Sequence, residues 1–428
     1  MSDFLDDYAT TRVPEDRTIG GVRIGMINGA LCFALPGLVA GVQIGGSLGL
    51  ERGIKVFLIG GLFLSVVGTI VGIVGVRNRV SSYILTQFVF GRAGAVILNL
   101  AIVVALLGWY GVNMDLLGAT VQQICEQLFA FAPPAWAVEV FAGMIMTVTA
   151  IFGFSLLNRA ASYAVPFLFL LTLYIGIKSL AAFNGDMQLV VAGSPSMTDG
   201  EAVTAVAGGF IVSAVLMSDF SRFARTDADA ATAAFLPFLG LSSFAYVGAA
   251  LAAIVFQQSD ILLVMLAMGL GVWALALIFV STWITNVVNL YSCSLSLSAV
   301  FKKQKHWHLT VVAGILGTGA ALMNILDAYT SFLFGLSIIF APIGGIFIVE
   351  FYVLRNMRPH DLESELDAPF RPAAAFAWAV GTAVALLSTS SVVTLTGFEV
   401  ADALLSAGFA YFVLAWFTSA NLRREPTS

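Results

Sequence analysis

Apolar runs of about 18 or more residues recur along the whole chain and constrain its fold more than any other feature. A run of about this length, wound as a helix, crosses a hydrocarbon core ~30 Å thick. The runs are continuous and do not alternate in units of about ten residues, so they predict helices and not the strands of a membrane barrel. They fall at 22–48, 54–76, 93–124, 135–157, 162–184, 203–222, 232–256, 270–299, 308–325, 331–354, 373–392 and 399–419. We predict an all-α integral membrane protein with about 12 transmembrane helices, plus a short extra helix at 260–268.

Charged residues support this assignment and exclude other classes of protein. Only 11% of the residues are charged, against roughly 25% in soluble domains. With a net charge of −5, the chain offers no basic surface for nucleic acid. His306 and His308 have no Cys, Asp or Glu close by in sequence, so we expect them in a solvated loop and not at a metal, and we expect His360 in a cytoplasmic loop as well. The cysteines, at 32, 125 and 293, are too scattered for a disulfide framework.

The distribution of basic residues predicts the orientation of the helices. If the N-terminus is cytoplasmic and the loops alternate, Arg52, Lys55 and Lys178 face outside and the other 17 of the 20 basic residues face the cytoplasm. A bias of this kind is typical of cell inner or plasma membrane proteins. We expect both termini in the cytoplasm and one membrane domain, and no obligate protein partner is evident. Its expected parts are an N-terminal tail at 1–20, helices at 21–184 and 202–354, a cytoplasmic loop at 355–372, two additional helices at 373–419 and a C-terminal tail at 420–428.

Two of the runs are interrupted near their centres. The first contains Ala34-Leu35-Pro36-Gly37, and the sixth contains Gly208-Gly209-Phe210. Breaks at corresponding positions, five helices apart, are typical of inverted-repeat transporters with a binding site at the midplane. The alternative is that small residues only let the helices pack closely, and the GxxxG spacing of Gly37, Gly41 and Gly45 fits this alternative well.

Four motifs in order resemble the nucleobase–cation symport family, in particular its cytosine permease branch. They are Gly108-Trp109-Tyr110-Gly111, Asp219-Phe220-x-Arg222-Phe223, Trp283-Ile284-Thr285-Asn286 and Ala341-Pro342-x-Gly344-Gly345. The resemblance implies a LeuT-type fold, with a five-plus-five inverted repeat, broken helices 1 and 6 and two additional C-terminal helices. It also implies uptake of a nucleobase by symport with Na⁺ or H⁺, through alternating access and without a cofactor.

Mapped onto this sequence, the resemblance implies a set of substrate-binding residues. Trp109 would stack on a flat heterocycle and Phe210 would cover it, since aromatic faces offer large contact areas. Asn286 would pair with ring nitrogens and carbonyls because its amide carries both donors and an acceptor. Ser213 and main-chain groups near Ala34 and Gly209 would complete the hydrogen bonding.

Departures from the pattern of this branch bear on the substrate. Leu106 stands where the branch has Gln, Gly209 where it has Ser, and Val287 where it has Asp. Losing polar partners of this kind can change the preferred ligand altogether. A nucleobase other than cytosine, or a hydantoin- or allantoin-type compound, fits at least as well, and an amino acid is the rival ligand for the same fold.

Two sites compete for the coupling ion. The resemblance implies sodium held by the carbonyls of Gly29 and Cys32 with Ser281 and Thr285, although Ile284 replaces one expected hydroxyl. The rival is Asp115, an ionisable residue inside a predicted span, which is a candidate for proton coupling. With no catalytic cluster within the spans and no phosphate-binding GxxxxGK[ST] loop, the sequence favours a secondary transporter over a membrane enzyme or an ATP-driven pump.

Overall fold

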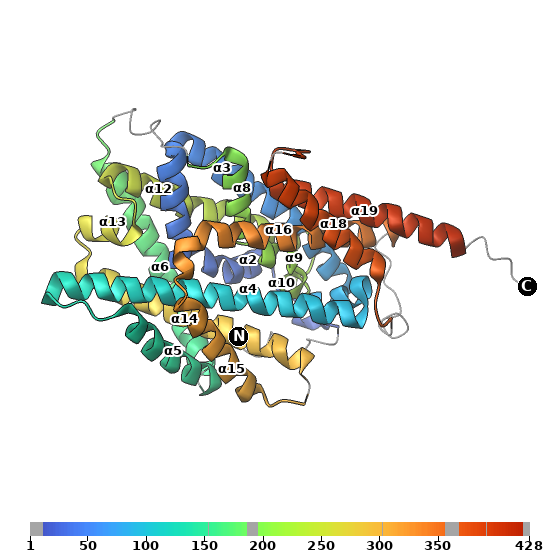
Figure 1. Ribbon diagram of the computed structural model, residues 1–428, viewed down its shortest axis with the longest axis horizontal. Helices are drawn as coiled ribbons and strands as arrows, with labels where there is room; N and C mark the ends of the chain where they lie inside the picture. The colour runs from blue at the N-terminus through green and yellow to red at the C-terminus, as the bar shows by residue number, and fades with distance from the viewer. Residues whose placement is uncertain are drawn as a thin grey trace, which may run out of the picture.

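The computed structural model describes residues 12–152, 154–185, 196–301, 303–355, 368–390 and 392–422. These residues form helices joined by turns and short connections, and one isolated bridge pairs Ile19 with Ala224. The helices form one bundle in which the long helix α4 (Ser82–Phe129) runs horizontally across Figure 1.

The helices of the first half include a break near residue 34. Besides α4 they are η1 (Glu15–Arg17), α2 (Gly21–Gly29), η2 (Ala30–Phe33), α3 (Leu35–Asn78), α5 (Ala135–Phe152) and α6 (Phe154–Ala182). Those of the second half are α8 (Asp199–Gly208), α9 (Ile211–Val215), α10 (Ser218–Ser221), α11 (Asp227–Phe235), η3 (Leu236–Leu241), α12 (Ser242–Phe256), α13 (Ile261–Ala267), α14 (Gly271–Val300), α15 (His306–Ala321), η4 (Ile325–Ala328), α16 (Tyr329–Ile348) and η5 (Val349–Leu354). The last two are α18 (Pro372–Thr389) and α19 (Glu399–Leu422).

Each predicted run coincides with a helix or with consecutive helical segments. The long helix α3 bends at Gly49, whose φ is 76°, so it carries the end of the first run and the whole of the second. Gly91 bends α4 in the same way, with φ 74°. Such positive φ values favour glycine because it lacks a Cβ. Six segments of the described chain are long and apolar enough to cross a membrane, and the count of about 12 crossings stays a prediction.

Some predicted boundaries differ from the observed ones. Helix α6 begins at Phe154, although the sequence predicted a span from residue 162, because a polar Asn-Arg stretch was taken as a loop. The prediction that His306 and His308 lie in a loop is wrong, since both are in the first turn of α15, where they are exposed. His360 and most of the loop at 355–372 lie outside the described residues. The extra helix predicted at 260–268 is confirmed as α13.

The described end of the N-terminal tail packs on the bundle. The Val13 backbone N–H donates to the Arg79 carbonyl (3.0 Å), and the Ile19 N–H donates to the Phe223 carbonyl (2.7 Å). Val13 is only 2% exposed. This segment therefore links the end of α3 to the residues after α10.

Small residues bring α3 and α12 into close contact. A Cβ on Gly41 would lie 2.7 Å from the Tyr246 carbonyl oxygen, and one on Gly45 would overlap Ala250. The GxxxG spacing thus serves close packing, as the alternative interpretation held, and it does so directly beside a real break.

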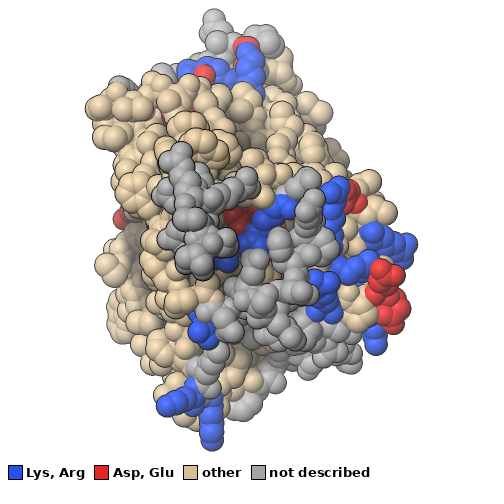
Figure 2. Space-filling view, turned by 90° about the vertical axis from the view of Figure 1, so that its right-hand side faces the viewer, with Lys and Arg blue, Asp and Glu red and all other residues tan. Residues whose placement is uncertain are grey.

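One face of the bundle gathers charge. Figure 2 shows Lys and Arg side chains on this face together with a few acidic ones. Two ion pairs form near the end of α3, Arg77 with Asp227 (2.6 Å) and Arg79 with Glu15 (3.7 Å).

Candidate functional site

The first break lies between α2 and α3. Residues Ala30–Phe33 form a short 3-10 turn, and Ala34 is extended, with ψ 146°. Helix α3 then starts with Pro36 in its first turn, where the missing N–H costs no helical bond. The Ala34 N–H donates to the Leu31 carbonyl (3.2 Å), and the Ala34 carbonyl accepts from the Gly37 N–H (3.0 Å). These local bonds stabilise the break, and each carbonyl oxygen keeps a lone pair for a second donor.

The second break lies between α8 and α9. Phe210 leaves helical geometry, with φ −136° and ψ 6°. The Gly209 N–H donates to the carbonyls of Ala205 and Val206 (3.3 Å each). A Cβ on Gly208 would overlap the carbonyl oxygen of Leu333 in α16, so glycine at 208 allows α8 to touch the α16 backbone. Both breaks that the sequence predicted are present.

Tyr246 of α12 lies between the two breaks. A Cβ on Gly209 would be 2.9 Å from the Tyr246 hydroxyl, and one on Gly37 would be 3.7 Å from its ring. Its ring also packs on Phe57, with centroids 5.3 Å apart. One buried aromatic side chain therefore contacts both interrupted helices.

Trp109 joins this region from α4. Its ring stands nearly edge-on to two rings at the start of α16, Tyr329 (6.2 Å, 72°) and Phe332 (5.4 Å, 79°). The Tyr329 hydroxyl donates to the Pro36 carbonyl at the first break (2.7 Å). Trp109 is partly buried, so it lies beside the break and keeps some free surface.

Helix α14 contributes polar groups without partners. Asn286 is fully buried, and its Nδ2 donates to the Tyr110 carbonyl next to Trp109 (3.1 Å). Its Oδ1 has no hydrogen-bond partner among the described residues, and the same holds for the Ser281 hydroxyl. An unsatisfied buried acceptor costs about 1–3 kcal/mol, which makes the Asn286 Oδ1 a candidate acceptor for a ligand.

The other predicted substrate residues occupy the second break. Phe210 packs on Phe238 of η3, with centroids 5.9 Å apart. The Ser213 hydroxyl donates to Asn28 Oδ1 of α2 (2.9 Å), which ties α9 to the helix before the first break. Leu106 and Ile284 are partly buried and Val287 is fully buried, so these departures lie within the bundle.

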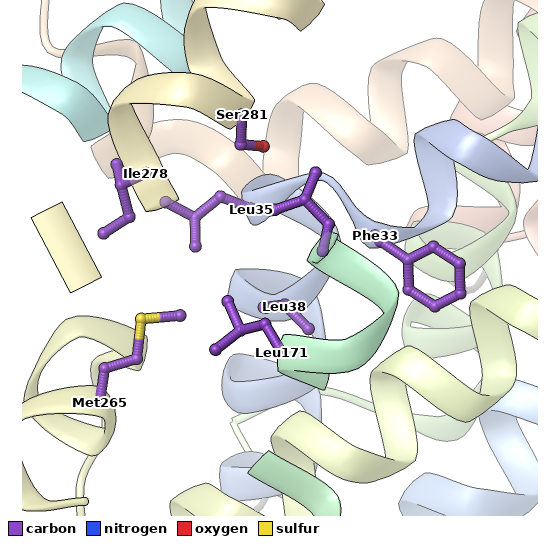
Figure 3. A pocket seen from close by; sticks show the side chains of 8 residues that line it. Phe33, Leu35, Leu38, Leu171, Met265, Ile278 and Ser281 are labelled. Atoms are coloured by element: carbon purple, nitrogen blue, oxygen red, sulfur yellow. The ribbon is translucent and has the colours of Figure 1, made fainter. Parts of the chain in front are cut away.

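A small pocket lies beside the first break and Ser281 (Figure 3). Its other lining residues are apolar: Phe33, Leu35, Leu38, Leu168, Leu171, Met265 and Ile278. Thr285 lies one turn after Ser281 and donates to the Ser281 carbonyl (2.9 Å). Cys32 turns its thiol to the Pro237 carbonyl (3.4 Å), and Gly29 is buried. The structure thus places the first break and Ser281 around one pocket.

Asp115 is buried and is not the only carboxylate there. It is 7% exposed and its Oδ2 accepts a hydrogen bond from the Leu326 backbone N–H (2.8 Å). Glu139 of α5, 3% exposed, approaches the same stretch of α4, since a Cβ on Gly118 would lie 2.6 Å from its Oε1. No group of three or more His, Cys, Asp and Glu that could hold a metal occurs among the described residues.

Sequence reasoning missed Tyr246, Tyr329, Asn28 and Glu139. Each is a polar or ionisable residue inside or at the edge of an apolar run, and in lipid that signal alone marks a candidate. The sequence does not show which of these residues contact each other, because partners such as Tyr329 and Pro36 are 293 residues apart.

The comparisons agree with this geometry. The family described as "Permease for cytosine/purines, uracil, thiamine, allantoin" matches residues 27–414. The cytosine permease of Escherichia coli strain K12 is 25% identical over 358 residues, which cover 83% of each chain.

Solved structures are similar over nearly the whole chain. An inward-facing structure of Mhp1 has a TM-score of 0.83 at 19% identity and covers 97% of this chain and 94% of its own. A second structure shows Mhp1, a nucleobase-cation-symport-1 family transporter, in a closed conformation with bromovinylhydantoin bound. It has a TM-score of 0.77 at 19% identity and covers 97% of this chain and 96% of its own. A Na⁺-coupled sialic acid symporter scores 0.60 at 13% identity, with 93% and 95% covered. The predicted LeuT-type fold is confirmed.

Proposed function

The chain belongs to the family of membrane permeases for cytosine/purines, uracil, thiamine and allantoin, and from this premise we propose that it imports a nucleobase or a related flat heterocycle by cation symport with alternating access. Membership makes it a multi-pass membrane transporter and not an enzyme. The observation that carries the substrate proposal is the meeting of both broken helices at Tyr246, with Trp109 attached to the first break through Tyr329.

In the proposed site, aromatic surface and one amide recognise the ligand. Trp109 stacks on the heterocycle, and Phe210 covers it from the second break. Asn286 accepts from a ring N–H through its unpartnered Oδ1. Ser213 and the main chain at Ala34 and Gly209 lie at the breaks, where their free lone pairs supply further acceptors.

A hydantoin- or allantoin-type substrate is the second candidate. Leu106 and Val287 remove polar groups from the cytosine permease pattern, and Mhp1, of the same fold, binds bromovinylhydantoin. A less polar site suits a hydantoin, which lacks the exocyclic amino group of cytosine, because unpaired buried groups are costly. An amino acid is the third candidate.

A thermal-shift screen of the purified permease tests the ligand class. We expect cytosine, uracil or bromovinylhydantoin to raise the apparent melting temperature, because a ligand at about 100 times Kd stabilises the folded state by about 2.7 kcal/mol. Amino acids serve as the comparison set. A response to amino acids alone would contradict the proposed substrate class.

We propose Na⁺ or H⁺ as the coupling ion. For Na⁺, the ligands are the carbonyls of Gly29 and Cys32, with Ser281 and Thr285 of α14, since sodium is a hard cation that prefers oxygen. For H⁺, the group is Asp115. Support for sodium comes from the unpartnered Ser281 hydroxyl, which lies beside the first break.

Thr285→Val tests the sodium site. We expect the variant to lose sodium-dependent stabilisation of the ligand complex, because valine keeps the shape and removes the oxygen. Thr310→Val is the matched control, since the Thr310 hydroxyl makes the same bond to a carbonyl one turn back, in α15 (3.1 Å). Equal sodium responses in wild type and Thr285→Val would rule out Thr285 as a ligand.

We propose that the permease lies in the cell inner or plasma membrane with both termini in the cytoplasm. The excess of 17 basic residues over 3 across alternate loops supports this orientation. A reporter active only in the cytoplasm, fused after residue 428, is expected to be active.

A further inference from the structure

Two buried carboxyl groups, Asp115 and Glu139, lie near the same stretch of α4. Asp115 is 7% exposed and Glu139 is 3% exposed. Gly118 lies one turn after Asp115, and the Glu139 Oε1 would contact a Cβ placed there (2.6 Å). The Glu139 carboxyl therefore lies on the same stretch of α4 as Asp115, and the two groups interact electrostatically.

No basic group neutralises this pair in the helices around it. A third acidic residue, Asp327 of η4, also acts electrostatically on Asp115. Helices α5 and α14, η4 and residues 105–129 of α4 contain no Lys, Arg or His, and α15 has only His306 and His308 in its first turn. The further acidic residue of this part of α4, Glu126, is exposed.

Glu139 also has no hydrogen-bond partner among the described residues, whereas Asp115 accepts from the Leu326 N–H (2.8 Å). A buried, unpaired carboxylate costs several kcal/mol, and a second negative charge beside it adds to that cost. One proton on the pair reduces both penalties, because it leaves only one of the two carboxyl groups charged.

We propose that Asp115 and Glu139 share one proton and that this proton is a coupling ion of transport. The second part rests on the proposed symport function. A proton from water forms the O–H bond of the pair, and breaking that bond returns the proton to water, so no other reactant is required.

The Leu326 hydrogen bond connects the pair to the substrate site. Leu326 lies three residues before Tyr329, whose hydroxyl binds the Pro36 carbonyl, and Phe332 packs on Trp109. Asp115 is therefore joined through η4 to the residues that contact the first break and Trp109.

Infrared spectroscopy of the purified full-length protein tests the shared proton without any substrate. We expect the C=O stretch of a protonated, buried carboxylic acid at neutral pH in wild type and in the control Glu126→Gln. Glu139→Gln should lose it, and Asp115→Asn should change the pH range over which it is lost, because a neighbouring charge is gone. A wild type without this band at neutral pH, or a band unchanged in both variants, would overturn the proposal.

Sodium-free proteoliposomes test the coupling role, with cytosine, uracil and bromovinylhydantoin each assayed as radiolabelled probes at zero membrane potential. An inside-alkaline gradient of about one pH unit allows one-proton symport to concentrate a neutral substrate about tenfold. We expect Glu139→Gln to abolish this accumulation and to keep exchange of substrate across the membrane, which an unfolded variant could not do.

The possible failures are distinguishable. Gradient-driven accumulation that persists in Glu139→Gln would overturn the coupling role, while substrate exchange would still support the proposed function. No exchange of any probe by wild type would overturn the proposed function and the coupling role with it. The infrared band alone decides whether the pair holds a proton.

Discussion

Trp109→Ala is expected to weaken binding of a planar base by roughly 5- to 150-fold, because stacking of a base on an aromatic side chain contributes about 1–3 kcal/mol. The ring also packs on Tyr329 and Phe332 at the start of α16, so its loss removes part of the wall around the first break. Isothermal titration of the detergent-solubilised protein with the base that gives the largest thermal shift measures the effect.

Two further variants separate stacking from general damage. Trp109→Phe keeps an aromatic face and should retain most of the affinity. Trp273→Ala, at a tryptophan of α14 that is 72% exposed, should leave binding unchanged. If Trp109→Ala bound the base as tightly as wild type, the stacking model would be wrong.

Gly208→Ala is expected to be among the most damaging single-methyl changes in the protein. Its Cβ would overlap the Leu333 carbonyl oxygen, which is backbone and cannot turn away. Helix α8 would have to separate from α16 beside the second break, and overpacking of this kind costs about 1–3 kcal/mol or more. We expect a lower apparent melting temperature and loss of substrate uptake.

Gly335→Ala is the matched control for this change. It lies on α16, near Leu333, and a Cβ there meets nothing within 4 Å. Alanine is the better helix former by up to about 1 kcal/mol, so this variant should be as stable as wild type or more so. Equal stability of Gly208→Ala and Gly335→Ala would show that the close contact of α8 with α16 is not required.

The breaks were predictable because their causes are local. Pro36 lacks an N–H, and Gly37 adds conformational freedom, so the first run had to be interrupted near its centre. The prediction of the second break relied on Gly208 and Gly209, and two adjacent small residues could equally have indicated close packing of helices. The structure shows both uses, since Gly208 contacts the α16 backbone and Phe210 leaves the helix.

The site residues were only partly predictable. Trp109 and Asn286 follow from the motifs, and Asn286 does lie beside Tyr110, the neighbour of Trp109. Tyr246 carries no motif, and nothing in a run of apolar residues says that its ring reaches two breaks. Asp115 was predicted as a candidate for proton coupling, but the sequence did not show that Glu139 of the next helix lies near it.

The recurrence of long apolar runs, by itself, determined that this chain is a bundle of helices in lipid, since a backbone without water must satisfy its hydrogen bonds within each segment. That constraint acts residue by residue along the chain and can be read from it. Only the tertiary structure decided which polar groups meet, because contacts such as Leu326 with Asp115, 211 residues apart, depend on how helices pack. The same packing decides which glycines allow two backbones to touch. It also decides which carboxyl groups are buried between helices.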